Sequence, residues 1–195
     1  GERVALMCRT RYEWTLVDYA VWTTGAVTVP VYETSSPYQI AWILEDSGAK
    51  AIIVETPAHA AAVGRVHDQL TGLKDVWQID TGALTELAEA GADITDDELE
   101  TRRASTNRQS IATIIYTSGT TGRPKGCELT HGNFKDLAEN AYHKPTDIVQ
   151  SDGASTLPFL PLAPVFARFL QAVAVRGTAR MGHSPRTHSL CADPA

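Results

Sequence analysis

The alternation of short apolar runs with longer amphipathic segments is the feature that most limits how this chain can fold. The runs Ala26–Val31, Lys50–Glu55 and Ile111–Tyr116 are rich in β-branched residues, a composition typical of buried strands. The segments Glu13–Thr24 and Ser36–Gly48 carry apolar residues at helical spacing. Repeated strand–helix alternation is typical of a mostly parallel sheet flanked by helices. We therefore predict an α/β fold.

Residues with special backbone preferences mark where some of these elements begin and end. Pro37 suits the first turn of a helix, so a helix is predicted to begin at Ser36 and Pro37, and Gly48 is predicted to end it. The remaining segments are less regular but fit the same alternation: a helix over His59–Leu70, a strand over Val76–Ile79, and surface helices over Thr81–Ala90 and Thr95–Arg103.

The balance of charge argues against nucleic acid as the main partner. Lysine and arginine total 17 and aspartate and glutamate total 23, a net charge of −6 over 195 residues, whereas binding to a phosphate backbone needs a basic face. The widely spaced Cys8, Cys127 and Cys191 fit neither a disulfide framework nor a zinc site, so a cytoplasmic setting is predicted. No apolar stretch approaches the ~18 residues of a membrane-spanning helix.

The two ends of the chain look unlike the rest. The sequence enters an apolar run, Val4–Met7, almost at once, which we interpret as the sign of a missing N-terminal part. Residues 176–195 show little apolar periodicity, and no later element is predicted to cover the apolar segment Leu157–Val175. We therefore expect residues 1–175 to be a partial domain and residues 176–195 to be an atypical tail, truncated or poorly ordered.

The stretch after Ile111–Tyr116 has the composition of a phosphate-binding loop. Its glycines permit close backbone approach and positive φ, its hydroxyl side chains add donors, and its lysine adds a mobile positive charge. Thr130 is predicted to cap a helix over His131–Tyr142, which makes the expected order strand, loop, helix. The candidate phosphate-binding residues are Thr117, Ser118, Gly119, Thr120, Thr121, Gly122 and Lys125.

Two better-known nucleotide motifs do not fit this loop. A Walker A loop needs Gly-Lys followed by Ser or Thr, but Lys125 lies between Pro124 and Gly126, and no predicted strand is followed by a GxGxxG pattern. On composition alone, a loop rich in serine, threonine and glycine is an ordinary solvated turn. The order of its residues is what distinguishes it.

The ordered string Tyr116–Gly126, YTSGTTGRPKG, is similar to the signature loop of the acyl-adenylate-forming (AMP-binding) enzymes, the family of acyl-CoA synthetases, luciferases and peptide-synthetase adenylation domains. Gly25–Val31 and Cys127–Asn133 resemble other segments of the family, and Tyr32–Ser36 and Leu160–Ala163 resemble its long-chain fatty acid–CoA ligase branch. The resemblance covers nearly the whole chain and implies an incomplete N-terminal domain of the adenylate-forming fold.

The resemblance implies a two-step reaction that uses ATP, Mg²⁺ and coenzyme A. A fatty acid carboxylate attacks the α-phosphate of ATP and releases pyrophosphate, and the thiol of coenzyme A then displaces AMP. It implies that Thr117 and Lys125 act in catalysis and that the candidate loop residues bind the ATP phosphates. The acidic residue for Mg²⁺ is expected outside this chain, so no metal ligand is predicted within it. A lipid substrate implies peripheral membrane contact in addition to the cytoplasmic setting.

Departures from the family pattern leave other functions open. The long-chain branch usually has histidine after Pro-Leu-Ala, and this chain has Pro164, which has neither a side-chain donor nor a backbone N–H. The adenine-binding, ribose-binding and C-terminal catalytic segments of the family do not occur in the sequence. The alternatives are another acyl-adenylate-forming ligase and a non-catalytic nucleotide-binding remnant. Phe166 is predicted to pack in the core rather than to line an acyl tunnel.

Overall fold

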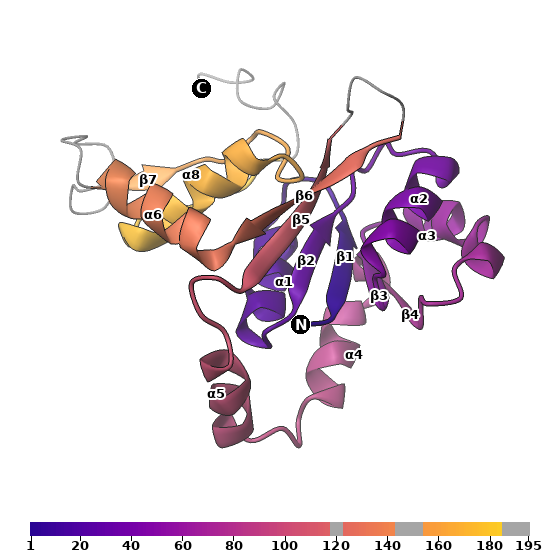
Figure 1. Cartoon of the computed structure of the whole chain (residues 1–195), viewed down its shortest axis with the longest axis horizontal. Coiled ribbons are helices and arrows are strands. Elements are labelled where there is room, and N and C mark those ends of the chain that lie inside the picture. Colours follow the sequence, from indigo (N-terminus) through magenta and orange to yellow (C-terminus); the bar gives the residue numbers. More distant parts are fainter. Residues whose placement is uncertain (118–122, 143–153, 185–195) are drawn as a thin grey trace, which may run out of the picture.

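The computed structural model of the protein describes residues 1–117, 123–142 and 154–184. Its main feature is a six-stranded sheet in the order β4-β3-β1-β2-β5-β6 (Figure 1). Neighbouring strands from β4 to β5 are parallel, and β6 is antiparallel to β5. The strands are β1 (Arg3–Met7), β2 (Val27–Pro30), β3 (Ala51–Val54), β4 (Asp75–Gln78), β5 (Ile111–Thr117) and β6 (Lys125–Thr130). A separate two-stranded sheet pairs β7 (Ser155–Thr156) with β8 (Arg180–Met181).

Helices cover both faces of the main sheet. They are α1 (Tyr12–Thr23), α2 (Pro37–Ser47), α3 (Pro57–Gly64), α4 (Ala83–Ala90), α5 (Asp96–Ala104), α6 (His131–Tyr142) and α8 (Val165–Arg176), with 3₁₀ turns η1 (His67–Gln69) and η2 (Ile79–Thr81). Helices α2 and α3 pack on the face that includes Ala5 and Ile52, and α1 packs on the face that includes Leu6 and Ile53, because strand side chains alternate. The predicted α/β fold is confirmed. Within the described residues, no helix has both the length and the apolar composition needed to cross a membrane.

Helix α2 begins and ends where the sequence predicts. The Ser36 hydroxyl accepts a hydrogen bond from the Gln39 backbone N–H at 3.3 Å, and the Gln39 side chain accepts one from the Ser36 N–H at 2.9 Å. Each bond satisfies a donor that the start of a helix leaves free. Gly48 has a φ of 64°, a left-handed conformation that favours glycine. A Cβ there would lie 2.9 Å from the Arg3 guanidinium, so a larger residue would have to displace the Arg3 side chain.

Two predictions about helices α3 and α8 are wrong. The helix expected over His59–Leu70 is α3, which begins at Pro57 and ends at Gly64, and only a 3₁₀ turn follows. Proline favours the first turn, which explains the earlier start, and glycine is a poor helix former, which explains the earlier end. Phe166 does not pack in the core but is 58% exposed, because α8 turns another side towards the sheet.

A buried arginine holds α8 against the rest of the molecule, beside α6 at the β6 end of the sheet (Figure 1). Arg168 is 2% exposed, and its Nη2 lies 2.7 Å from Oδ1 of Asp18 in α1. Its Nη1 donates to the Thr113 hydroxyl of β5 at 2.6 Å. Three aromatic rings have centroids 5.2 to 5.4 Å from its guanidinium carbon, namely Trp14, Trp22 and Phe134. One residue therefore ties α8 to α1, β5 and α6.

Candidate functional site

Strands β5 and β6 form a hairpin that carries the predicted phosphate loop at its tip. Thr117 and Lys125 are the last paired residues before the tip, and both are exposed. The structure thus brings together the first and last of the predicted phosphate-binding residues, and we call these two residues the hairpin mouth. The predicted residues between them lie outside the described residues: Ser118, Gly119, Thr120, Thr121 and Gly122.

The predicted order of strand, loop and helix is wrong in one respect, because β6 lies between the loop and the helix. Helix α6 does begin at His131, and Thr130 caps it by accepting a hydrogen bond from the Asn133 N–H at 3.3 Å. Strand β6 is an edge strand with four of its six residues exposed, so it lacks the apolar run that signals a strand. At ~3.3 Å per residue, it places the start of α6 about 20 Å from the loop. The helix start therefore does not donate to a phosphate at the hairpin mouth.

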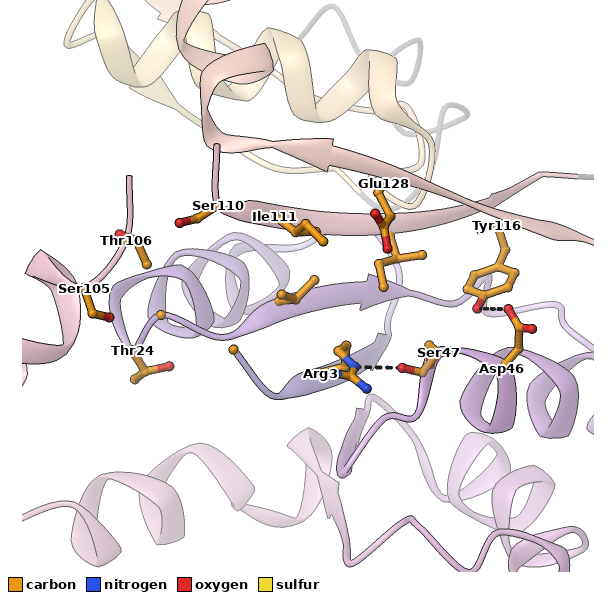
Figure 2. Close-up of a pocket in the computed structure, with 15 residues that line it drawn as sticks. Arg3, Thr24, Asp46, Ser47, Ser105, Thr106, Ser110, Ile111, Tyr116 and Glu128 are labelled. Carbon is orange, nitrogen blue, oxygen red and sulfur yellow. Dashed lines mark hydrogen bonds between the residues drawn. The ribbon is translucent and has the colours of Figure 1, made fainter. Parts of the chain in front are cut away.

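Strand β5 is tied to α2 just before the hairpin mouth. The Tyr116 hydroxyl donates to Oδ2 of Asp46 at 2.6 Å (Figure 2). Burial, together with this bond to a carboxylate, raises the pKa of Tyr116 above its ordinary range, so the hydroxyl stays protonated and keeps donating. Both side chains also line a cavity of about 970 Å³ that reaches Arg3 and Glu128 (Figure 2). Neither residue of the hairpin mouth lines that cavity, so it is a separate space.

A smaller cavity, of about 460 Å³, opens beside the hairpin mouth. It lies at the carboxyl ends of β2 and β5, the edge of an open α/β sheet at which ligands bind. Pro164, the N-cap residue of α8, lines this cavity together with Thr117. The position at which the resemblance implies histidine thus faces the same space as a predicted catalytic residue. The other lining residues are Tyr32, Ser35, Gln39, Ile43, Ile115, Tyr116, Pro124 and Val165.

The chemistry of the hairpin mouth suits an anionic ligand. A threonine hydroxyl and a lysine ammonium both donate hydrogen bonds, and both bind phosphate oxygens. A divalent cation such as Mg²⁺ instead needs oxygen ligands, above all carboxylates. Among the residues that the structure describes, no three His, Cys, Asp or Glu side chains come together as a metal site. The described residues of the hairpin mouth therefore suit a phosphate group but do not by themselves form a site for Mg²⁺.

A buried carboxylate that the sequence did not predict lies just after β3. Glu55 is 1% exposed and accepts hydrogen bonds from the backbone N–H of Arg9 at 2.8 Å and from its Nε at 2.9 Å. Arg11 brings a second guanidinium to 3.4 Å. Burial alone would raise the pKa of Glu55, but the bonds from Arg9 outweigh burial and lower it. Glu55 and Arg9 are 46 residues apart, so no local pattern could have signalled the pair.

The class of protein follows from a family model, with which the fold is consistent. A mostly parallel, helix-covered sheet of this kind is found in the N-terminal domains of adenylate-forming enzymes. The family model for the AMP-binding enzyme matches residues 1–193. The chain belongs to the AMP-binding enzyme family.

Solved structures share this fold. The inhibitor-bound N-terminal domain of FACL13 from Mycobacterium tuberculosis has a TM-score of 0.73 at 24% identity, over 95% of this chain and 44% of that one. ATP-bound MatB from Rhodopseudomonas palustris has a TM-score of 0.72 at 19% identity, over 95% of this chain and 35% of that one. At these identities, the two structures show the fold alone.

Two curated relatives are more informative about chemistry. The long-chain-fatty-acid–CoA ligase FadD15 of Mycobacterium tuberculosis is 44% identical over 187 residues, which are 93% of this chain and 31% of the ligase. The human long-chain-fatty-acid–CoA ligase 6 is 29% identical over 199 residues, which are 92% of this chain and 28% of the ligase. The chain therefore spans about a third of the length of these relatives.

Proposed function

We propose that this chain is the ATP-phosphate-binding portion of a long-chain-fatty-acid–CoA ligase. The observation that carries the proposal is the pairing of Thr117 with Lys125, both exposed, beside a cavity at the carboxyl edge of the sheet. The names of the two curated relatives support a long-chain fatty acid as the acid and coenzyme A as the acyl acceptor. The proposed substrates are a fatty acid, ATP and coenzyme A, with Mg²⁺ as the accompanying metal. Residues 1–175 are proposed as a partial domain, with the tail beginning at residue 176.

In the proposed reaction, the described residues act through electrostatics. A carboxylate oxygen bonds to the α-phosphorus of ATP while the bond to pyrophosphate breaks, so negative charge builds up on the leaving group. The Lys125 ammonium and the Thr117 hydroxyl donate to phosphate oxygens and stabilise that charge. The thiolate of coenzyme A then attacks the acyl carbon, and AMP leaves. The roles proposed for the remaining loop residues rest on the sequence alone: Ser118, Gly119, Thr120, Thr121 and Gly122.

Replacement of the lysine tests this proposal. The variants are made in the intact protein, expressed from the reading frame that contains this chain. Lys125→Ala should slow ATP–pyrophosphate exchange about ten- to a hundredfold, because a hydrogen bond to a charged group contributes about 1.5–3 kcal/mol. The matched control is Lys135→Ala, which removes an exposed lysine of α6 and should leave exchange unchanged. Equal exchange rates in both variants would contradict the assignment of Lys125.

A second candidate function is a nucleotide-binding module that does not turn over. It is favoured by Pro164, because proline supplies no donor to the cavity that Thr117 lines. In that case the intact protein binds ATP but shows no pyrophosphate exchange. Restoration of pyrophosphate exchange by Pro164→His would show that Pro164 is the cause of the missing activity.

We also propose that the protein works in the cytoplasm and contacts the membrane surface, where a lipid substrate is held. Cys8 is buried and Cys127 is exposed, and both are free thiols, which suits a reducing compartment. Co-sedimentation of the intact protein with phospholipid vesicles tests the membrane contact, and protein that stays in the supernatant at every vesicle concentration argues against it.

A further inference from the structure

We propose that a stripe of three side chains on α2 positions the phosphate-binding hairpin. The side chains are Tyr38, Trp42 and Asp46, and we call them the α2 brace. They are four residues apart along the helix, so they lie on one face of it. Each interacts with a residue one or two positions from the hairpin mouth. The inference rests on the proposed function only in naming ATP as the ligand, because the contacts do not depend on it.

Trp42 holds the peptide unit that leads into Lys125. Its Nε1 donates to the carbonyl oxygen of Pro124 at 2.8 Å. That carbonyl and the backbone nitrogen of Lys125 belong to the same peptide unit, which is planar. Fixing the carbonyl therefore fixes the direction in which the chain enters Lys125.

Arg123, the residue before Pro124, stacks on the α2 brace. Its guanidinium carbon lies 4.6 Å from the ring centroid of Trp42 and 5.8 Å from that of Tyr38. Both distances are within the ~6 Å over which a cation is attracted to a ring face. Tyr38 is 62% exposed, so the closer and more buried Trp42 is the main partner.

The other arm of the hairpin is held by the same helix. Tyr116 donates to Asp46 at 2.6 Å, and Tyr116 immediately precedes Thr117. Each residue of the hairpin mouth is therefore preceded by a residue that is bonded to α2. Because strand side chains alternate, Thr117 lies on the opposite side of the hairpin from Tyr116 and α2. The α2 brace thus fixes the backbone and leaves the mouth free for a ligand.

Trp42→Phe in the intact protein tests the brace, because it removes the Nε1 donor and keeps an aromatic ring. The matched control is Trp22→Phe, which removes an equivalent bond from Trp22 Nε1 to the carbonyl of Ala112 at 2.8 Å, on β5 but away from the mouth. We expect amide hydrogen exchange of residues 123–130 to accelerate roughly two- to tenfold in Trp42→Phe and not in the control. The KM for MgATP should rise by a similar factor in Trp42→Phe only.

A second pair of variants separates positioning from general stability. Arg123→Lys keeps the cation, so its KM for MgATP should stay close to the wild-type value. Arg123→Gln removes the cation, so its KM for MgATP should rise. Equal hydrogen exchange in the Trp42 and Trp22 variants would overturn the brace, and so would faster exchange with an unchanged KM. If the wild-type protein shows no pyrophosphate exchange, the proposed function fails, and hydrogen exchange alone decides whether Trp42 holds the hairpin.

Discussion

Removing Asp18 should destabilise the fold far more than losing one surface carboxylate would. The Arg168 guanidinium, 2% exposed, loses hydrogen bonds of 2.7, 3.0 and 3.2 Å in Asp18→Ala. Among the described residues, the Thr113 hydroxyl is the acceptor that it keeps. Removing one partner of a buried pair typically costs about 3–5 kcal/mol. The three surrounding aromatic rings still attract the cation, so we expect the lower end, about 3 kcal/mol.

Urea unfolding of the intact protein, followed by tryptophan fluorescence, measures this cost. The decisive comparison is the double variant Asp18→Leu/Arg168→Met, in which no charge stays buried. Exchanging a buried ion pair for apolar side chains is often close to neutral, so the double variant should lose less stability than Asp18→Ala alone. The reasoning is refuted if Asp18→Ala costs less than about 1 kcal/mol, or if the double variant loses as much stability as Asp18→Ala.

Three other positions offer separate tests. Pro164→His should increase acyl-CoA formation, because the imidazole adds a hydrogen-bond donor to the cavity beside the hairpin mouth. An unchanged or lower rate would show that the reaction does not need a donor at position 164. The pKa of Glu55 is lowered from its ordinary value of 4.5. The stabilising contribution of Glu55 is therefore present above pH 4.5 and is lost as the pH falls through the lower folded-state pKa. In Glu55→Gln, the free energy of unfolding should depend less steeply on pH in this acid range. Gly48→Ala should lower the free energy of unfolding by about 1–2 kcal/mol in thermal unfolding, because the left-handed φ of this residue disfavours alanine and the new Cβ would lie close to the Arg3 side chain. Gly64→Ala is the control: a Cβ there meets open space, so this variant should be neutral or stabilising.

The elements that could be predicted from the sequence are those that local chemistry decides. Ser36 and Gly48 mark the ends of α2 through a side-chain cap and a left-handed backbone, and both signals are visible in the sequence. Strand β5 is buried and β-branched, so its apolar run identifies it. Strand β6 was missed because an edge strand is made by backbone pairing, and its side chains carry little pattern.

The candidate site was predictable only in part. The motif located the loop and therefore Thr117 and Lys125, but it could not show that they face each other across a hairpin. The contacts that hold α8, whose N-cap residue lines the cavity, were beyond prediction, because the partners lie far apart in the sequence: Asp18 and Arg168 are separated by 150 residues. Such pairs depend on the strand order, which local patterns do not specify.

The hairpin and the α2 brace also differ in how far along the chain their partners lie, which bears on the order of folding. Closing a loop of about ten residues takes roughly 10–100 ns, so the hairpin mouth can form locally. The bonds from Trp42 to Pro124 and from Tyr116 to Asp46 span 82 and 70 residues, so they form only when β5 docks beside β2. Because a protein is synthesised from its N-terminus, α2 leaves the ribosome before the hairpin does. The residues of the supporting surface are therefore synthesised before the loop that they position.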